Sequence, residues 1–183
     1  VVGSTTSGCR RSKQGELIVS GEGRTQLGSL DEGLSPTWLS PWRRGVPDFE
    51  WETDIRSVLL AKVALNAVIN PLTALHGVTN GELLQPPLQA IIEKVIEEVQ
   101  SVLVSADATE IASALPAQVR AVCDNTAANH SSMRVDLEGS TQTEIDAIVG
   151  WLLSSLSPHP PATPVLSELY EAVKERDVTL LRA

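Results

Sequence analysis

Residues 58–70 read VLLAKVALNAVIN, a stretch in which only Lys62, Asn66 and Asn70 are polar. A helix built from this stretch is apolar around most of its circumference, which is typical of a buried helix. The three polar residues lie four positions apart and therefore form one stripe, which drifts by about 40° per step. The stretch predicts a buried helix with one polar face, and Pro71 is expected to end it directly after Asn70.

Two interpretations of this polar face remain open on spacing alone. In the first, Lys62 reaches solvent through its aliphatic stem while the two asparagines hydrogen-bond to neighbouring helices. In the second, the face borders a cleft. Buried polar groups without partners would each cost about 1–3 kcal/mol, so a polar ligand or water would supply part of their hydrogen bonding.

Around this helix the chain divides into a β-rich beginning and a helical remainder. Within residues 1–48, the runs 16–20 and 24–28 flank Gly21-Glu22-Gly23, which predicts a β-hairpin. From about Glu50 onward the apolar spacing is helical and predicts no further strand. Helices are expected near residues 52–70, 86–105, 108–129, 141–156 and 163–177.

The composition favours a folded soluble protein and argues against several classes of function. Lysine and arginine total 14 against 23 aspartates and glutamates, and the resulting net charge of −9 repels phosphate groups. We therefore expect no nucleic-acid and no membrane partner. Separated histidines and unpaired cysteines predict neither a metal site nor a disulfide framework. The chain has no uninterrupted apolar run of about 20 residues and no signal-peptide pattern at its start, so we expect a cytoplasmic protein.

Three blocks of sequence resemble the ketopantoate reductase family. The first is KVALNAVINPLTAL at residues 62–75 followed by NGEL at 80–83, which has the family's lysine, its two asparagines at intervals of four, the proline and the asparagine-glycine pair. The second is NHSSMRVD at residues 129–136, and the third is TEIDAIVG at 143–150. The blocks stand in the family's order, and weaker similarity extends over nearly the whole chain.

The resemblance implies a mainly α protein. Residues 49–183 would form an all-helical substrate-binding and catalytic domain of the 6-phosphogluconate-dehydrogenase-like type. Residues 1–48 would be a short β remnant, the last strands of the Rossmann domain that binds NADP in this family.

The resemblance also implies a reaction, the reduction of 2-dehydropantoate (ketopantoate) by NADPH to pantoate on the route to pantothenate and coenzyme A. Hydride addition leaves negative charge on the keto oxygen, so Lys62 would polarise that oxygen and donate a proton to it. Glu144 would be the second catalytic residue and would also help to place the cofactor. The expected substrate-binding residues are Asn66, Asn70, Asn80, Asn129 and Ser132.

Several features of the sequence keep other interpretations open. No G-x-G-x-x-G phosphate-binding motif occurs in the 183 residues, and residues 138–142 contain no basic residue where the family usually has one. Thr141 and Glu144 also fit a capping box at a helix start. The alternatives are a truncated, non-catalytic helical module that dimerises, and a reductase of another 2-oxo acid. A homodimer is compatible with each of them.

Overall fold

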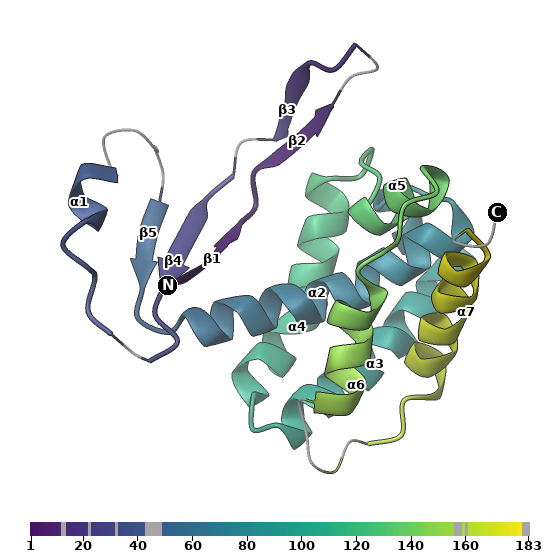
Figure 1. Cartoon of the computed structure of the whole chain (residues 1–183). Helices are drawn as coiled ribbons and strands as arrows, with labels where there is room; N and C mark the ends of the chain where they lie inside the picture. Colours follow the sequence, from purple (N-terminus) through teal and green to yellow (C-terminus); the bar gives the residue numbers. More distant parts are fainter. Residues whose placement is uncertain are drawn as a thin grey trace. The chain divides into compact units, whose positions relative to one another are not determined.

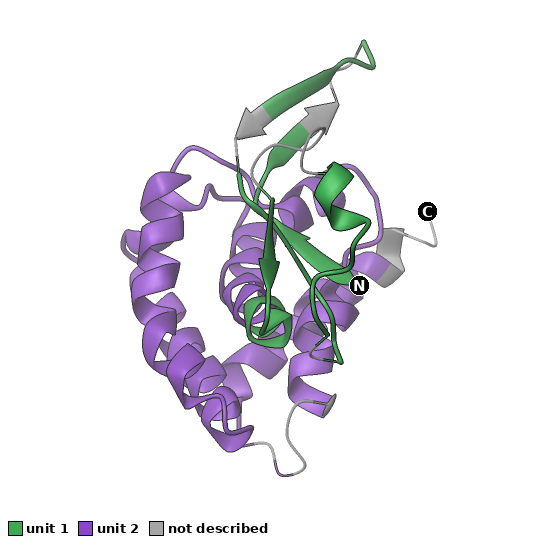
Figure 2. Cartoon of the chain, turned by 90° about the vertical axis from the view of Figure 1, so that its left-hand side faces the viewer, with its two compact units in different colours: residues 1–60 green, residues 61–183 purple. Residues whose placement is uncertain are grey.

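The computed structural model of the chain describes residues 1–11, 14–21, 23–31, 33–42, 49–155, 159 and 161–180. The chain forms two compact units, residues 1–60 and residues 61–183, coloured green and purple in Figure 2. The predicted domain boundary between residues 48 and 49 adjoins residues 43–48, which lie outside the described residues, so that boundary stays a prediction.

The first unit is built on β-strands. Strand β1 (Val2–Thr5) pairs antiparallel with β4 (Thr25–Gly28), and β5 (Phe49–Glu52) pairs parallel with β4, which gives a sheet of order β1-β4-β5. Strands β2 (Gly8–Arg11) and β3 (Leu17–Gly21) form a separate antiparallel pair, and α1 (Leu39–Trp42) is a single helical turn. The prediction of no strand from about Glu50 onward was wrong for β5, because four residues are too few to display a strand period.

The predicted hairpin was wrong in its pairing, although both of its strands exist. Strand β3 pairs with β2 and strand β4 pairs with β1, so the chain reverses between β2 and β3. Gly15 lies in that connection with a φ of 88°, a backbone conformation that glycine adopts without strain. Gly23 and Arg24 were predicted to lie in or beside the turn. They instead form hydrogen bonds with Ser7 and Thr6, in the segment between β1 and β2.

The second unit is helical (Figure 1). It contains most of α2 (Ile55–His76), and then η1 (Gly81–Leu84), α3 (Leu88–Ser105), α4 (Thr109–Asn125), α5 (Ser132–Glu138), η2 (Asp146–Gly150), α6 (Trp151–Ser155) and α7 (Pro164–Leu180). The mainly α fold class predicted from the sequence is confirmed. Helix α5 was not predicted, and the helix expected at 141–156 is a π-helical segment, η2, that continues into α6.

Helix α2 does not end at Pro71, so the prediction of its end was wrong. The helix continues through the proline to His76. A proline inside a helix costs about 3 kcal/mol through a lost hydrogen bond and a clash with the preceding turn. The side chains of Val68, Ile69 and Leu72 around it are 0–2% exposed, and their packing outweighs that local cost.

The core of the helical unit follows the apolar periodicity of the helices. On α3 the buried residues recur every three or four positions, at Leu88, Ile92, Val95, Ile96, Val99, Val102 and Leu103. This face of α3 packs against α4 and α7. The carboxylate of Glu98 on α3 accepts hydrogen bonds from the first backbone amides of α7, Val165 N at 3.0 Å and Leu166 N at 2.7 Å. It thereby caps the beginning of that helix.

Among the described helices, α2 is long and apolar enough to cross a membrane when it is judged by length and composition alone. Half of its most apolar window is buried inside the fold, as in the core helix of a folded domain.

Candidate functional site

The polar face of α2 changes from exposed to buried along the helix. Lys62 is exposed, Asn66 is half-buried and Asn70 is 6% exposed. Ala64, Ala67 and Val68 between them are fully buried. Among the described residues, the side-chain amides of Asn66 and Asn70 find no hydrogen-bond partner. The structure therefore offers no support for asparagines bonded to neighbouring helices, and it leaves these amides available to a polar ligand.

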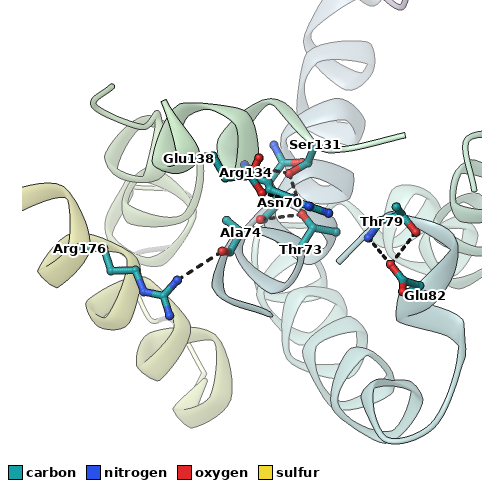
Figure 3. A network of polar contacts seen from close by, with 9 residues as sticks. All are labelled: Asn70, Thr73, Ala74, Thr79, Glu82, Ser131, Arg134, Glu138 and Arg176. Carbon is teal, nitrogen blue, oxygen red and sulfur yellow. Dashed lines mark hydrogen bonds and ion pairs between the residues drawn. The ribbon is translucent and has the colours of Figure 1, made fainter. Parts of the chain in front are cut away.

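One turn beyond Asn70, α2 is bonded to the segment that carries the predicted serine. The buried hydroxyl of Thr73 donates to Ser131 Oγ at 2.6 Å and also lies 3.0 Å from the carbonyl oxygens of Ile69 and Asn70 (Figure 3). Ser131 Oγ accepts the backbone N–H of Arg134 and so caps α5. This contact between residues 58 positions apart joins α2 to the beginning of α5.

Ser132, the predicted substrate-binding serine, is the first residue of α5 and is exposed. The prediction missed Ser131, which is buried and performs the structural role. A helix-capping pattern could have revealed it. A serine directly before a helix is a typical N-cap, because its hydroxyl oxygen can accept the backbone N–H three residues later. The two adjacent serines therefore have different surroundings.

Two further predicted residues, Asn80 and Asn129, come together through the backbone. Asn80 N donates to Asn129 O at 3.0 Å, and Gly81 N donates to Ala127 O at 3.1 Å. Asn80 Nδ2 donates to Thr126 Oγ1 at 2.8 Å, whereas its Oδ1 is buried without a partner. A buried acceptor without a donor is costly, so this oxygen suits a ligand or water at the same place. Asn129 itself is exposed.

Glu144 is exposed and lies two residues before the first residue of η2, Asp146. Among the described contacts, Thr141 and Glu144 do not form the reciprocal bonds of a capping box. Thr143 Oγ1 accepts the backbone N–H of Ile145 at 3.3 Å instead. The described contacts do not join Glu144 to the polar face of α2.

Acidic groups gather around Glu144. Burial raises the pKa of Asp136, and the charges of Glu144 and Asp177 raise it further. Asp177, on α7, accepts two hydrogen bonds from Thr143. Glu144 therefore stands close enough to Asp136 for its charge to raise the pKa of that carboxyl.

A cation beside these segments is an arginine that sequence reasoning did not single out. Arg134 lies in α5, has a side chain only 14% exposed, and contacts Glu138 through Nε at 2.6 Å. Its hydrogen bond and charge lower the pKa of Glu138. The backbone and side-chain hydrogen bonds of Thr79, with a smaller contribution from Arg134, lower the pKa of Glu82. The site is thus not without a basic residue, although residues 138–142 have none.

An open groove of about 640 Å³ lies at the carboxyl end of α2. Its walls are Ala74–Gly77, Leu137, Glu138, Glu175 and Arg176, and none of the predicted site residues lines it. Arg176 reaches across to the carbonyl oxygen of Ala74 at 3.4 Å (Figure 3).

Comparison with known proteins identifies the family of the chain. The sequence model of the ketopantoate reductase PanE/ApbA C-terminal domain matches residues 54–177, more than half of the chain. The chain belongs to the ketopantoate reductase family. This confirms the resemblance, and the helical unit is the C-terminal domain of that family.

Relatives match over almost the whole chain. A 2-dehydropantoate 2-reductase of Salmonella typhimurium is 36% identical over 180 residues, covering 97% of this chain and 58% of the relative. The crystal structure of the probable 2-dehydropantoate 2-reductase of Bacillus subtilis matches with a TM-score of 0.77 and 32% identity, covering 95% of this chain and 60% of that one. The chain therefore spans somewhat over half the length of these ketopantoate reductases.

A more distant structure shows the same fold. A dimeric ketopantoate reductase of Staphylococcus aureus matches with a TM-score of 0.71 at 16% identity, covering 97% of this chain and 62% of that one.

Proposed function

We propose that this chain is the substrate-binding and catalytic part of an NADPH-dependent reductase that converts 2-dehydropantoate to pantoate. The observation that carries the proposal is the polar face of α2, where Asn66 and the buried Asn70 have side-chain amides without described partners and follow Lys62 at intervals of four. The membership of the family and the relatives at 36% identity support it. The pathway to pantothenate would place the protein in the cytoplasm.

The proposed chemistry takes place at the keto oxygen of the substrate. NADPH would supply the hydride, which leaves negative charge on that oxygen. The ammonium group of Lys62 would stabilise this charge and donate a proton to it. Asn66 and Asn70 would orient the substrate through the donors and acceptors that they leave free.

The remaining predicted residues would bind the rest of the substrate. Ser132 and Asn129 would hydrogen-bond its carboxylate or hydroxyl, and the orphaned Oδ1 of Asn80 would accept from that hydroxyl or from an ordered water. Glu144 would help to order the complex of substrate and cofactor.

The residues of this chain do not fit the phosphate groups of NADPH. Its sequence has no G-x-G-x-x-G motif, the turn that in Rossmann domains places a dinucleotide's pyrophosphate at the beginning of a helix. The part of the reaction that these residues can perform is at the substrate.

A second candidate function is a non-catalytic helical module. The chain spans only 58% of the Salmonella relative, and a related reductase from Staphylococcus aureus is dimeric. In this alternative the chain would form a homodimer through its helical unit. A reductase acting on another 2-oxo acid is distinguished from the leading proposal by the preferred substrate alone.

The test is ketopantoate-dependent oxidation of NADPH. It is measured for the chain by itself and for the chain fused behind the nucleotide-binding region of the Salmonella typhimurium relative. We expect activity only in the fusion, with Lys62→Ala lowering kcat by about 10²–10⁴-fold, as for loss of a general acid.

Lys94→Ala is the matched control, because Lys94 is an exposed lysine on α3 outside the site. Unchanged turnover by Lys62→Ala would contradict the proposed mechanism. Faster reduction of a different 2-oxo acid would identify another substrate. A folded fusion that reduces none of them would support the non-catalytic module.

A further inference from the structure

Asp177 is a buried carboxylate near the end of α7, with 6% of its surface exposed. It accepts the backbone N–H of Thr143 at 3.2 Å through Oδ1 and the hydroxyl of the same residue at 2.7 Å through Oδ2. Hydrogen bonds to a charged acceptor are roughly twice as strong as neutral ones, and two of them to one residue define its position as well as its distance. Asp177 thus holds Thr143 in place from 34 positions away.

Further hydrogen bonds hold the backbone on both sides of Glu144. Thr143 Oγ1, which donates to Asp177, also accepts the backbone N–H of Ile145 at 3.3 Å. The carbonyl oxygen of Glu144 in turn accepts Ile148 N at 3.0 Å inside the first turn of η2. The backbone is therefore restrained immediately before and after Glu144.

The carboxylate of Glu144 has no such restraint. It is exposed and makes no side-chain hydrogen bond to another described residue. Where this carboxylate can reach is consequently decided by the backbone that carries it, and that backbone is held by the bonds from Asp177 to Thr143.

The electrostatics of the segment argue against a purely stabilising role. Burial, followed by the charges of Glu144 and Asp177, raises the pKa of Asp136, so Glu144 and Asp177 each repel the carboxylate of Asp136. Like charges placed together disfavour the folded state. A neutral acceptor at position 177 would avoid this repulsion but could not accept both bonds from Thr143 equally well.

We propose that Asp177 is a positioning residue, whose hydrogen bonds to Thr143 set the place of Glu144 relative to the substrate site. The part of this inference that concerns substrate rests on the proposed function. The part that concerns the backbone does not.

The backbone part is tested by amide hydrogen exchange on the chain. Asp177→Asn removes one of the two acceptor oxygens, so we expect exchange at Thr143, Ile145 and Ile148 to become at least about tenfold faster. Thr143→Val, which breaks the side-chain half of the same contact, should accelerate Ile145 and Ile148 similarly.

Glu98→Gln is the matched control for this experiment. Glu98 is also a carboxylate that accepts two hydrogen bonds across a helix contact, but it holds the beginning of α7 and not the segment before η2. Its substitution should leave exchange at Ile145 and Ile148 unchanged. Equal exchange at these amides in Asp177→Asn and in the unsubstituted chain would overturn the inference.

The functional part is tested by a double-mutant cycle in the active fusion. Asp177→Asn should lower kcat/KM for ketopantoate about tenfold when Glu144 is present and have no further effect in the Glu144→Gln background. Glu98→Gln should change kcat/KM by the same factor in both backgrounds. Independent, additive effects of Asp177→Asn and Glu144→Gln would show that Asp177 does not act through Glu144.

The two failures remain distinguishable. A folded fusion without reductase activity would overturn the proposed function, and the exchange measurement would then decide the positioning role of Asp177 by itself.

Discussion

Thr73 shows how much a single hydroxyl contributes at this site. It is fully buried, and its Oγ1 lies within hydrogen-bonding distance of Ser131 Oγ and of two backbone carbonyl oxygens. Through Ser131 it connects the polar face of α2 to the helix that begins with Ser132. Nothing in the local sequence pattern distinguishes this threonine from an ordinary helical residue.

Replacing Thr73 by valine should destabilise the helical unit by about 1–3 kcal/mol, because Ser131 loses a partner while the shape of the side chain is kept. Urea denaturation followed by circular dichroism measures this difference. Thr73→Ser keeps the hydroxyl and should retain the bond to Ser131. A loss in Thr73→Ser as large as that in Thr73→Val would mean that the methyl group, and not the hydrogen bond, carries the effect.

Asp136 predicts a pH dependence of stability with a definite sign. Its pKa is raised above the usual 3.8, first by burial and then by the charges of Glu144 and Asp177. The folded chain therefore binds this proton more tightly than the unfolded chain does. Stability falls as the pH rises from 3.8 through the raised pKa, and the full cost is present at neutral pH.

Asp136→Asn should accordingly be more stable than the unsubstituted chain at pH 7, and the difference should shrink as the pH is lowered toward 3.8. Thermal unfolding at a series of pH values measures it. Asp146→Asn is a control of opposite sign. The hydrogen bonds from Lys174 and Tyr170 lower the pKa of Asp146, so its loss should destabilise the chain at pH 7. A lower stability of Asp136→Asn at pH 7 would contradict the assignment.

At the scale of elements, η1 depends on a close approach that only glycine permits. A Cβ added at Gly81 would lie 2.7 Å from the Cβ and 2.9 Å from the Cα of Ala127. The two backbones are joined at this point by the hydrogen bonds of Asn80 and Gly81 to residues 129 and 127. In this asparagine-glycine pair, Asn80 therefore provides the polar side chain, and Gly81 allows the close backbone approach that places it.

Gly81→Ala should force these segments apart and destabilise the unit by about 1–3 kcal/mol, as overpacking does elsewhere. It should also raise the KM for ketopantoate in the active fusion, because Asn80 is displaced. Gly33→Ala is a mild control, since the nearest atom to its added Cβ would be 3.3 Å away on a serine side chain. An unchanged melting temperature in Gly81→Ala would show that the two segments adjust without cost.

The elements that were predicted correctly are those with long apolar periods. In helices α3 and α4 buried residues recur over several turns, so the helical period is clear even where single residues depart from it. Helix α5 was missed because seven residues contain too few turns to display a period. The end of α2 and the pairing of β3 and β4 were wrong because Pro71 and Gly21 carry local preferences that distant contacts override.

At the scale of the whole molecule, the proposed substrate-binding residues occur in a sequence of 183 residues without a phosphate-binding G-x-G-x-x-G turn. We expect no saturable binding of NADPH to the 183-residue chain, since its sequence has no G-x-G-x-x-G turn. Isothermal titration calorimetry measures this, with the whole Salmonella typhimurium relative as the positive control. Micromolar binding by the chain alone would reveal a nucleotide site built from other residues.

The sequence by itself determined the mainly helical class, the polar face of α2 and the identity of the family. These depend on residue types at short, regular spacings, which a helix converts directly into a face. Only the tertiary structure decided that Ser131 is the buried serine, that the backbones of Asn80 and Asn129 meet, and that Asp177 holds the residue before Glu144. Each of these contacts joins residues 34 to 58 positions apart or lies between two loops. A local period in the sequence cannot predict such a pairing.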